Sequence, residues 1–242
     1  AADKARLRAF RLPREDVYVT YCEKSTTMRN RYFTADKERR ESVCLSSGTP
    51  FTVADLPAGV SGDIWQFAGL IYGDYADDML PFCAARGAVA LDAQGVLRHV
   101  DPETGNMYFE DWAAKKDLLP LVTFLKTDAA EAEILTGTSD RAEAAKILHG
   151  WGAKEVLITH NAEVLACDGK GIYTCPIKAR NLSGRTGRGD TAFAAYLVER
   201  LHGDVETALR YATAAVSLKM ETPGPFCGAR TYVEDYLRTF YR

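Results

Sequence analysis

Long apolar stretches and concentrations of positive charge are both missing from this sequence. No uninterrupted apolar run approaches the ~20 residues that a membrane-spanning helix needs. Residues 1–16 are charged throughout, unlike a secretory signal peptide. The formal net charge is −3, and no basic stripe marks a nucleic-acid-binding surface. We therefore expect neither a membrane nor a nucleic acid as a partner.

Patterns typical of disulfides and zinc sites are missing too. The cysteines show no C-x-x-C pairing, and most lie in apolar segments, where cysteine behaves as a small hydrophobe. The histidines lie far apart and lack metal-ligand spacing. We expect a reduced, cytoplasmic protein without zinc. The residues concerned are Cys22, Cys44, Cys83, Cys167, Cys175, Cys227, His99, His149, His160 and His202.

The 242 residues are enough for one large domain with a buried core or for two small ones. The first 50 residues are rich in strand and turn signals, and we expect them to form a partial β-hairpin lid with a leading segment. Residues 51–242 are expected to form an α/β core. Whether two copies of the chain form a homodimer through this lid is left open. The expected lid elements are a helix end over 1–12, a short strand over 17–21, and strands over 26–34 and 41–45 around a turn at 35–39.

Beyond residue 60 the pattern changes to continuous apolar strands that alternate with helices. This order predicts a Rossmann-like, three-layer α/β domain with a mostly parallel sheet. A hairpin at 164–167 and 171–175 should add antiparallel strands at one sheet edge. The expected strands are 64–70, 88–92, 121–125 and 155–159; the expected helices are 74–86 (capped by Asp74), 108–117, 128–136, 140–149, 190–201, 204–220 and 230–241.

The two long helices near the carboxyl end carry apolar stripes at helical spacing, which are typical of core rather than of a cofactor site. The first stripe is Phe193, Ala194, Leu197, Val198 and Leu201; the second is Val205, Ala208, Leu209, Ala212, Val216 and Met220.

A glycine-rich turn at residues 181–193 is the most informative stretch. Gly187 and Gly189 allow a tight turn and expose backbone N–H groups without a Cβ. Because a helix follows, its first N–H groups lack partners and favour an anion. Asp190 lies beside them and could act as a general base. An Asp in a first turn can equally well serve as a helix cap.

Several motifs in order resemble the ribokinase-like (PfkB) carbohydrate kinase family over roughly residues 15–242. Its D-T-x-G-A-G-D-x-F signature is similar to residues 184–193, with Phe193 one place later. Its N-x-x-E element resembles residues 128–131, followed by L-x-G at 135–137. A strand-end D-x-N resembles 92–94, T-x-G resembles 159–161, and the later Pro-Gly matches 223–224.

The resemblance implies roles for these residues. Asp190 is expected to take the proton from a substrate hydroxyl, while the amides of Gly187, Arg188 and Gly189 form an anion hole for the transferring phosphoryl group. Four further residues are expected beside the nucleotide. They are Thr186, Thr159, Asn161 and Gly224.

Mg²⁺ is expected near Asp128 and Glu131, mostly through water. These two residues also fit a capping box, which needs no metal, and one residue could serve both purposes. Asp92 fits a substrate-binding position or a turn, with the turn slightly favoured. Thr159 and Asn161 could contact a nucleotide, but their residue types equally suit the turn that enters the edge hairpin.

Two residues depart from the signature. Gly184 replaces its first aspartate, which casts doubt on activation by potassium. Arg188 replaces a small residue, and its guanidinium either contacts phosphate or points to solvent. The family's early substrate-binding strand has no counterpart before residue 15, so we expect part of the sugar pocket to be missing from this sequence.

The sequence therefore predicts an enzyme that uses ATP and Mg²⁺ to phosphorylate a hydroxyl on a sugar or sugar-like substrate. Two alternatives stay open. One is a nucleoside kinase of the same family, and the other is a non-catalytic regulator that binds a sugar or a nucleotide.

Overall fold

A six-stranded mixed sheet forms the centre of the molecule. The computed structural model describes residues 12–32, 40–184 and 186–242. Strands β3, β4, β7 and β8 pair with one another in parallel. Strands β9 and β10 extend the sheet with antiparallel pairing. In spatial order the strands are β10 (Ile172–Pro176), β9 (Glu163–Cys167), β8 (Glu155–Thr159), β7 (Phe124–Asp128), β4 (Ala88–Asp92) and β3 (Ile64–Phe67).

One face of the sheet packs against a first group of helices. Successive strand residues point to opposite faces, and Leu91, Leu125 and Ile158 belong to the core cluster on this side. Near-continuous apolar strands are expected where helices cover both faces. The helices of this group are α2 (Met79–Ala84), α3 (Gln94–Leu97), α4 (Lys115–Leu118), α5 (Ala129–Thr136) and α6 (Arg141–Gly150).

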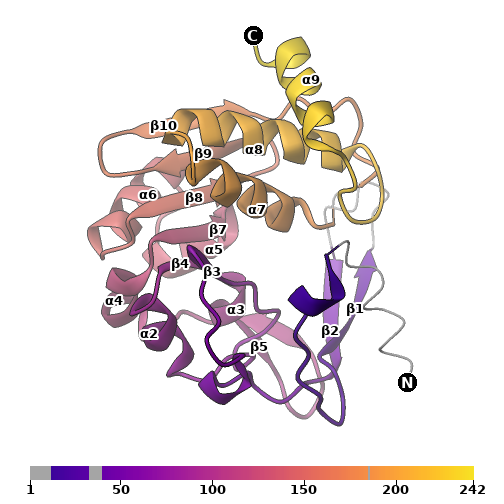
Figure 1. Cartoon of the computed structure of the whole chain (residues 1–242), viewed down its shortest axis with the longest axis vertical. Helices are drawn as coiled ribbons and strands as arrows, with labels where there is room; N and C mark the ends of the chain where they lie inside the picture. Colours follow the sequence, from indigo (N-terminus) through magenta and orange to yellow (C-terminus); the bar gives the residue numbers. More distant parts are fainter. Residues whose placement is uncertain (1–11, 33–39, 185) are drawn as a thin grey trace.

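The other face is covered by α7 (Arg188–Arg200) and α8 (Val205–Met220), which pack against each other, and by α9 (Arg230–Phe240) (Figure 1). Ala90, Phe124 and Leu157 of the strands join this second cluster. The three-layer, mostly parallel α/β fold predicted from the sequence is therefore confirmed.

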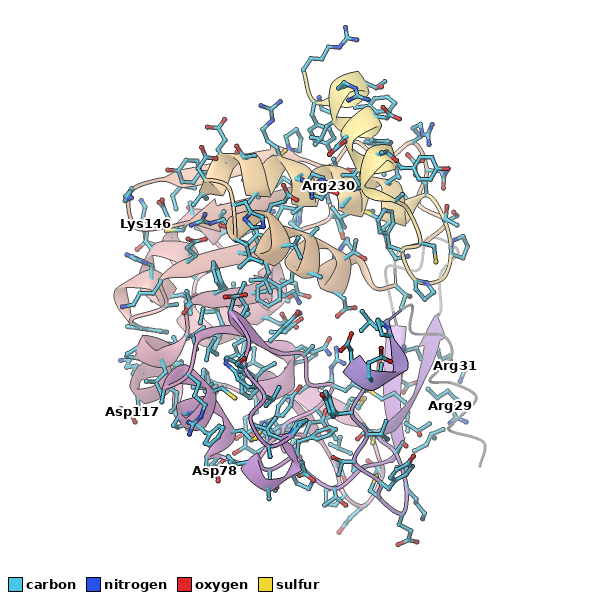
Figure 2. All side chains as sticks on the ribbon, viewed as in Figure 1. Arg29, Arg31, Asp78, Asp117, Lys146 and Arg230 are labelled. Atoms are coloured by element: carbon cyan, nitrogen blue, oxygen red, sulfur yellow. The ribbon has the colours of Figure 1, made fainter. Side chains whose placement is uncertain are left out.

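A separate hairpin of β1 (Thr27–Tyr32) and β2 (Arg40–Ser46) lies on the side away from α2, α4 and α6 (Figure 1). Its strands match the predicted pair, while the predicted turn at 35–39 lies outside the described residues. Arg29 and Arg31 are exposed at the outer edge of the molecule (Figure 2). A second small sheet pairs β5 (Arg98–Val100) with β6 (Met107–Phe109).

Several helices begin and end at the capping residues that the local sequence predicts. Asp128 and Glu131 form a capping box at α5, which ends at Gly137 with φ +78°. Asp140 caps α6 and Asp204 caps α8 through backbone N–H groups, as predicted. These contacts lie within one turn of chain, so neighbouring residues suffice to specify them.

Four predicted elements were wrong or displaced. Residues 17–21 form no strand. The Asp74 carboxylate accepts hydrogen bonds from the N–H groups of Leu70 and Ile71 instead of capping a helix, and α2 begins only at Met79. The helix predicted over 108–117 is replaced by β6, which pairs with β5, and by the short α4.

The strand predicted at 121–125 begins three residues later. Leu119–Leu121 instead form a 3₁₀ turn that contains Pro120 near its start, where proline fits well. The helix predicted over 1–12 falls largely on residues outside the described ranges. No helix in the described part of the chain is long and apolar enough to cross a membrane.

The predicted core stripe of α7 was only partly right. Phe193 and Leu197 are buried, but Val198 and Leu201 are exposed, as is Ala194. At 3.6 residues per turn, each i,i+4 step rotates the side chain by about 40°, so the stripe drifts away from the core. Tyr196 is buried in its place. The predicted stripe of α8 is buried throughout.

Candidate active site

A cavity of about 430 Å³ opens where the carboxyl ends of β4, β7 and β8 meet the start of α7. Ligands of open α/β sheets bind at this edge, because the strands end there and helix N-termini face the same space. Ten of the eleven predicted site residues line the cavity. They are Asp92, Asp128, Glu131, Thr159, Asn161, Thr186, Gly187, Arg188, Gly189 and Asp190.

Gly224, the remaining predicted site residue, does not line this cavity. It has φ +88°, and no atom lies within 4 Å of the place a Cβ would take. Its assignment to the nucleotide stays a prediction.

The glycine loop passes directly into α7. Gly187 is the N-cap residue, with φ +83°, a conformation that glycine adopts without strain. Its carbonyl accepts from Thr191 N at 3.0 Å, which is the first intrahelical bond. The N–H groups of the first turn that follow it have no intrahelical acceptor. A row of backbone donors therefore faces the cavity.

Asp190 lies in the first turn of α7 but does not cap it, since Gly187 occupies that position. The Asp190 side chain is exposed at the cavity. An accessible carboxylate beside backbone donors can accept a proton from a bound hydroxyl group.

Arg188 extends along the cavity rather than into bulk solvent. Its guanidinium donates a hydrogen bond to Asn161 Oδ1, and both residues are part of the lining. The contact places a cation next to the donors of the first turn. Guanidinium groups suit phosphate oxygens, because their donors form a planar fork.

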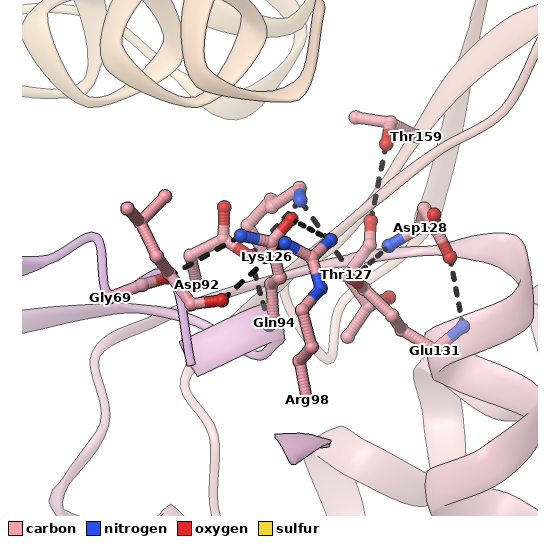
Figure 3. A network of polar contacts seen from close by, with 10 residues as sticks. Gly69, Asp92, Gln94, Arg98, Lys126, Thr127, Asp128, Glu131 and Thr159 are labelled. Carbon is pink, nitrogen blue, oxygen red and sulfur yellow. Dashed lines mark hydrogen bonds and ion pairs between the residues drawn. The ribbon is translucent and has the colours of Figure 1, made fainter. Parts of the chain in front are cut away.

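A buried lysine lies beneath the loop, and the sequence analysis missed it. Lys126 of β7 is 5% exposed, and its Nζ is 3.0 Å from Asp92 Oδ1 and 3.8 Å from Glu131 Oε2 (Figure 3). A Cβ placed on Gly189 would lie 3.0 Å from the same Nζ. The signal was a lysine in the middle of a predicted buried strand, at a position where charged residues are rare.

This cluster shifts the protonation of its members. Burial alone disfavours the Lys126 ammonium, but the charges of Glu131 and Asp92 outweigh it and raise the pKa of Lys126. Burial raises the pKa of Glu131 to about 7, although the Lys126 charge acts in the opposite direction. Strongly shifted groups inside a cavity are common at functional sites.

Asp92 both stabilises a turn and joins the buried cluster. Its Oδ1 accepts from Gln94 N at 3.1 Å and from Lys126 Nζ. Gln94 Oε1 then accepts from Arg98 at 2.6 Å, so polar contacts run from Lys126 through Asp92 and Gln94 to Arg98 (Figure 3). Thr159, buried at the end of β8, donates to the Thr127 carbonyl at 3.4 Å.

The free oxygens of the Asp128 and Glu131 carboxylates decide how Mg²⁺ could bind here. Asp128 Oδ1 accepts from Glu131 N at 2.8 Å, and Glu131 Oε2 accepts from Asp128 N at 2.7 Å. The capping box thus occupies one oxygen of each residue. Among the described residues no cluster of three or more His, Cys, Asp or Glu could hold a metal. A Mg²⁺ ion that retains most of its water fits here, whereas an all-protein cage does not.

The far part of the cavity is lined by residues from the hairpin and from β3 to β6. Met28 and Asn30 alternate with the outward-facing Arg29 and Arg31, as expected for a strand. Arg98, only 4% exposed, was not predicted either. The remaining lining residues of this part are Leu70, Gln94 and Phe109.

A model of the pfkB family of carbohydrate kinases matches residues 11–227. The chain belongs to this family. Solved structures of the same fold include Arabidopsis thaliana ribokinase complexed with ribose and ATP, at 21% identity over 83% of this chain and 65% of that one, with a TM-score of 0.62. At that identity the likeness concerns the fold alone.

Two more similar structures are pyrophosphate-dependent kinases of the ribokinase family. One, a sulfate complex, is 35% identical over 88% of this pfkB-family chain and 75% of its own, with a TM-score of 0.79. The other, complexed with a pyrophosphate analog and myo-inositol, is 37% identical over 81% and 70%, with a TM-score of 0.74.

A curated relative is the cytidine kinase of Thermococcus kodakarensis. It is 40% identical over 94 residues, which are 36% of this chain and 34% of the relative. The match thus spans about a third of the length of that kinase. These relatives are all phosphotransferases that act on hydroxyl groups, but they differ in donor and acceptor.

Proposed function

We propose that this chain transfers a phosphoryl group to a hydroxyl of a sugar-like polyol. The observation that carries the proposal is the position of Asp190, an exposed carboxylate in the first helical turn of α7, where backbone N–H groups border the same space. Both border one cavity, so a base and an anion hole can act on the same bound group.

In the proposed reaction Asp190 takes the proton of the acceptor hydroxyl as its oxygen attacks the donor phosphorus. A new O–P bond forms, and the bond to the bridging oxygen of the donor breaks. The amides of Gly187, Arg188 and Gly189 donate to the oxygens of the group in transfer. Positioning and charge stabilisation supply most of the catalysis in such reactions.

Asp128 and Glu131 are the residues that would hold Mg²⁺, through water. When bound, the ion would neutralise charge on the donor phosphates. Because one oxygen of each carboxylate already belongs to the capping box, this role is compatible with the structural one.

For the donor we propose pyrophosphate, with the ATP predicted from the sequence as the second candidate. The relatives at 35% and 37% identity are pyrophosphate-dependent, whereas the ATP complex is similar at the level of fold. The cations of Arg188 and Lys126 at the loop also support a small, highly charged donor.

For the acceptor we propose a cyclic polyol of the myo-inositol type, because one of the similar structures contains myo-inositol. A nucleoside is the second candidate, favoured by the match to a cytidine kinase. Oxygen-rich acceptors of both kinds suit the polar far part of the cavity, which includes Asn30, Gln94 and Arg98.

The test pairs each donor, pyrophosphate or ATP, with myo-inositol, ribose or cytidine, and follows phosphorylated product by ³¹P NMR. We expect turnover with pyrophosphate and myo-inositol. Asp190→Asn should retain its fold and lose about 10²-fold or more in kcat. Asp117→Asn, an exposed substitution in α4 at the opposite edge (Figure 2), is the matched control.

Wild-type turnover in the Asp190→Asn variant would refute the mechanism. Binding of a polyol or nucleoside by the wild type without any product would favour the non-catalytic regulator.

A further inference from the structure

A second buried lysine, Lys219 in the last turn of α8, lies beside the glycine loop. It is 2% exposed, and its Nζ donates to the carbonyl of Gly184 at 2.8 Å and to that of Thr222 at 3.3 Å. Its Cε lies 3.4 Å from the place a Cβ on Gly187 would take. The Lys219 ammonium therefore joins the start of the loop to the residues that follow α8, and the lysine side chain passes beside the helix-capping Gly187.

Backbone carbonyls, rather than a carboxylate, compensate this charge. Burial lowers the pKa of Lys219, and no neighbouring charge contributes to the shift. Within the described ranges Lys219 takes part in no ion pair, unlike Lys126 with Asp92 and Glu131. A buried ammonium needs strong acceptors, and converging carbonyl oxygens are the ligands with which proteins replace the water around a K⁺ ion.

The local backbone is arranged so that these carbonyls can converge. A Cβ on Gly184 would lie 1.8 Å from the Thr222 oxygen, so only glycine permits this approach. Gly184 N donates to the Met220 carbonyl at 2.7 Å, and Ser183 Oγ donates to that of Glu221 at 2.7 Å. Gly184 is also where the related signature has an aspartate. The glycine that stands in place of this carboxylate and the buried Lys219 ammonium are therefore in direct contact.

We propose that Lys219 is a resident cation that holds the glycine loop in its anion-binding shape, so that this loop needs no monovalent metal ion. Lys219 is a positioning residue: it contacts the loop backbone and not the reacting atoms. The proposal rests on the proposed function, because it concerns how the same loop is kept ready for a phosphoryl group. Its positive charge also adds to the field that the loop amides create.

The experiment measures turnover at constant ionic strength in choline, sodium and potassium chloride. We expect wild-type kcat to stay within about twofold across the salts. Lys219→Ala should lose about tenfold or more in choline chloride, because the carbonyls lose the cation that draws them together. K⁺ or methylammonium should restore part of the loss, since either fits between the two carbonyls.

Two variants serve as controls. Lys219→Met should lose activity without rescue, because its side chain fills the space that an added cation would use. Lys178→Met should behave like the wild type: it also removes a contact from Nζ to a backbone carbonyl, that of Phe240, but on an exposed residue outside the cavity lining.

Thermal unfolding gives a readout that does not need turnover. K⁺ should raise the Tm of Lys219→Ala relative to choline, because it binds only the folded state, and should leave the wild type and Lys219→Met unchanged. Failure of the wild type with every donor and acceptor would refute the proposed function and leave this readout intact. Activation of the wild type by K⁺, full activity of Lys219→Met, or no K⁺-specific Tm rise in Lys219→Ala would overturn the role of Lys219.

Discussion

Lys126 and Lys219 each place an ammonium group next to a glycine of the same loop, Lys126 at Gly189 and Lys219 at Gly184. Their charges are balanced differently. Asp92 and Glu131 pair with Lys126, whereas backbone carbonyls surround Lys219. The amides of this loop border the cavity on one side, and two lysine ammonium groups lie next to its backbone. Such an arrangement suits the strongly charged phosphoryl donor that we propose.

The raised pKa of Glu131 makes stability depend on pH. The pKa is about 7 in the folded chain, against an ordinary value of 4.5 for glutamate, so the folded state binds this proton more tightly. Glu131 therefore contributes fully to the free energy of unfolding below about pH 4.5, and this contribution is lost as the pH rises through about 7. We expect Glu131 to lower the free energy of unfolding by about 3 kcal/mol over that range.

Urea unfolding of wild type and Glu131→Gln between pH 4.5 and pH 8 measures this contribution. The decline should be smaller in Glu131→Gln, which can still accept the Asp128 N–H bond of the capping box. Glu133→Gln, an exposed change on the same helix, is the control. Identical pH profiles for wild type and Glu131→Gln would contradict the assignment.

At the scale of elements, the transition from loop to α7 depends on one residue with positive φ. Gly187→Ala should cost about 1 kcal/mol in backbone strain, because Gly187 has φ +83°. Relaxation of that strain should move the loop. Since the proposed anion hole lies in that loop, we expect a clear fall in kcat. Steady-state kinetics and urea unfolding measure the two effects.

Gly137→Ala is the matched control for this element. Gly137 ends α5 with φ +78°, and nothing lies within 4 Å of an added Cβ. It should show a similar stability loss with unchanged kcat. If Gly137→Ala and Gly187→Ala lowered kcat equally, the special role of the loop would be excluded.

At the scale of the whole molecule, the cavity is completed by chain segments that are distant in sequence. The hairpin residue Met28 shares its lining with Asp190 of α7. Met28→Ala should raise the KM for the acceptor several-fold and leave kcat nearly unchanged, because it removes apolar contact area and no reacting group. Steady-state kinetics with varied acceptor tests this.

Arg29→Ala is the control for Met28, because its side chain is on the outer face of the same strand (Figure 2). We expect it to leave the acceptor KM unchanged. An equal rise in both variants would mean that the hairpin acts through its folding and not through its cavity-facing side chain.

Local signals in the sequence specified most of the fold. β4 and β8 have continuous apolar centres, and α5, α6 and α8 begin at capping aspartates, so residues within a few positions determine them. The predictions failed where a distant partner decided the outcome. Residues 107–109 pair with 98–100 as a strand instead of joining a helix. The Asp74 carboxylate accepts a hydrogen bond from the Leu70 N–H instead of capping a helix.

The candidate site divides in the same way. The glycine loop, Asp190 and the capping box are contiguous in sequence, so their chemistry is visible there. Lys126, Lys219 and Arg98 are single charged residues in separate segments. Their positions became meaningful only when folding brought Lys126 to Gly189 and Lys219 to Gly184 and Gly187.

The sequence by itself determined most of the order of strands and helices, the family resemblance and the glycine loop that we propose binds phosphate, because hydrophobic periodicity and turn chemistry act over a few residues. Only the tertiary structure decided which buried charges support the loop and which residues complete the cavity. The energy of a buried charge depends on the atoms around it, and here those atoms come from segments far apart in the chain.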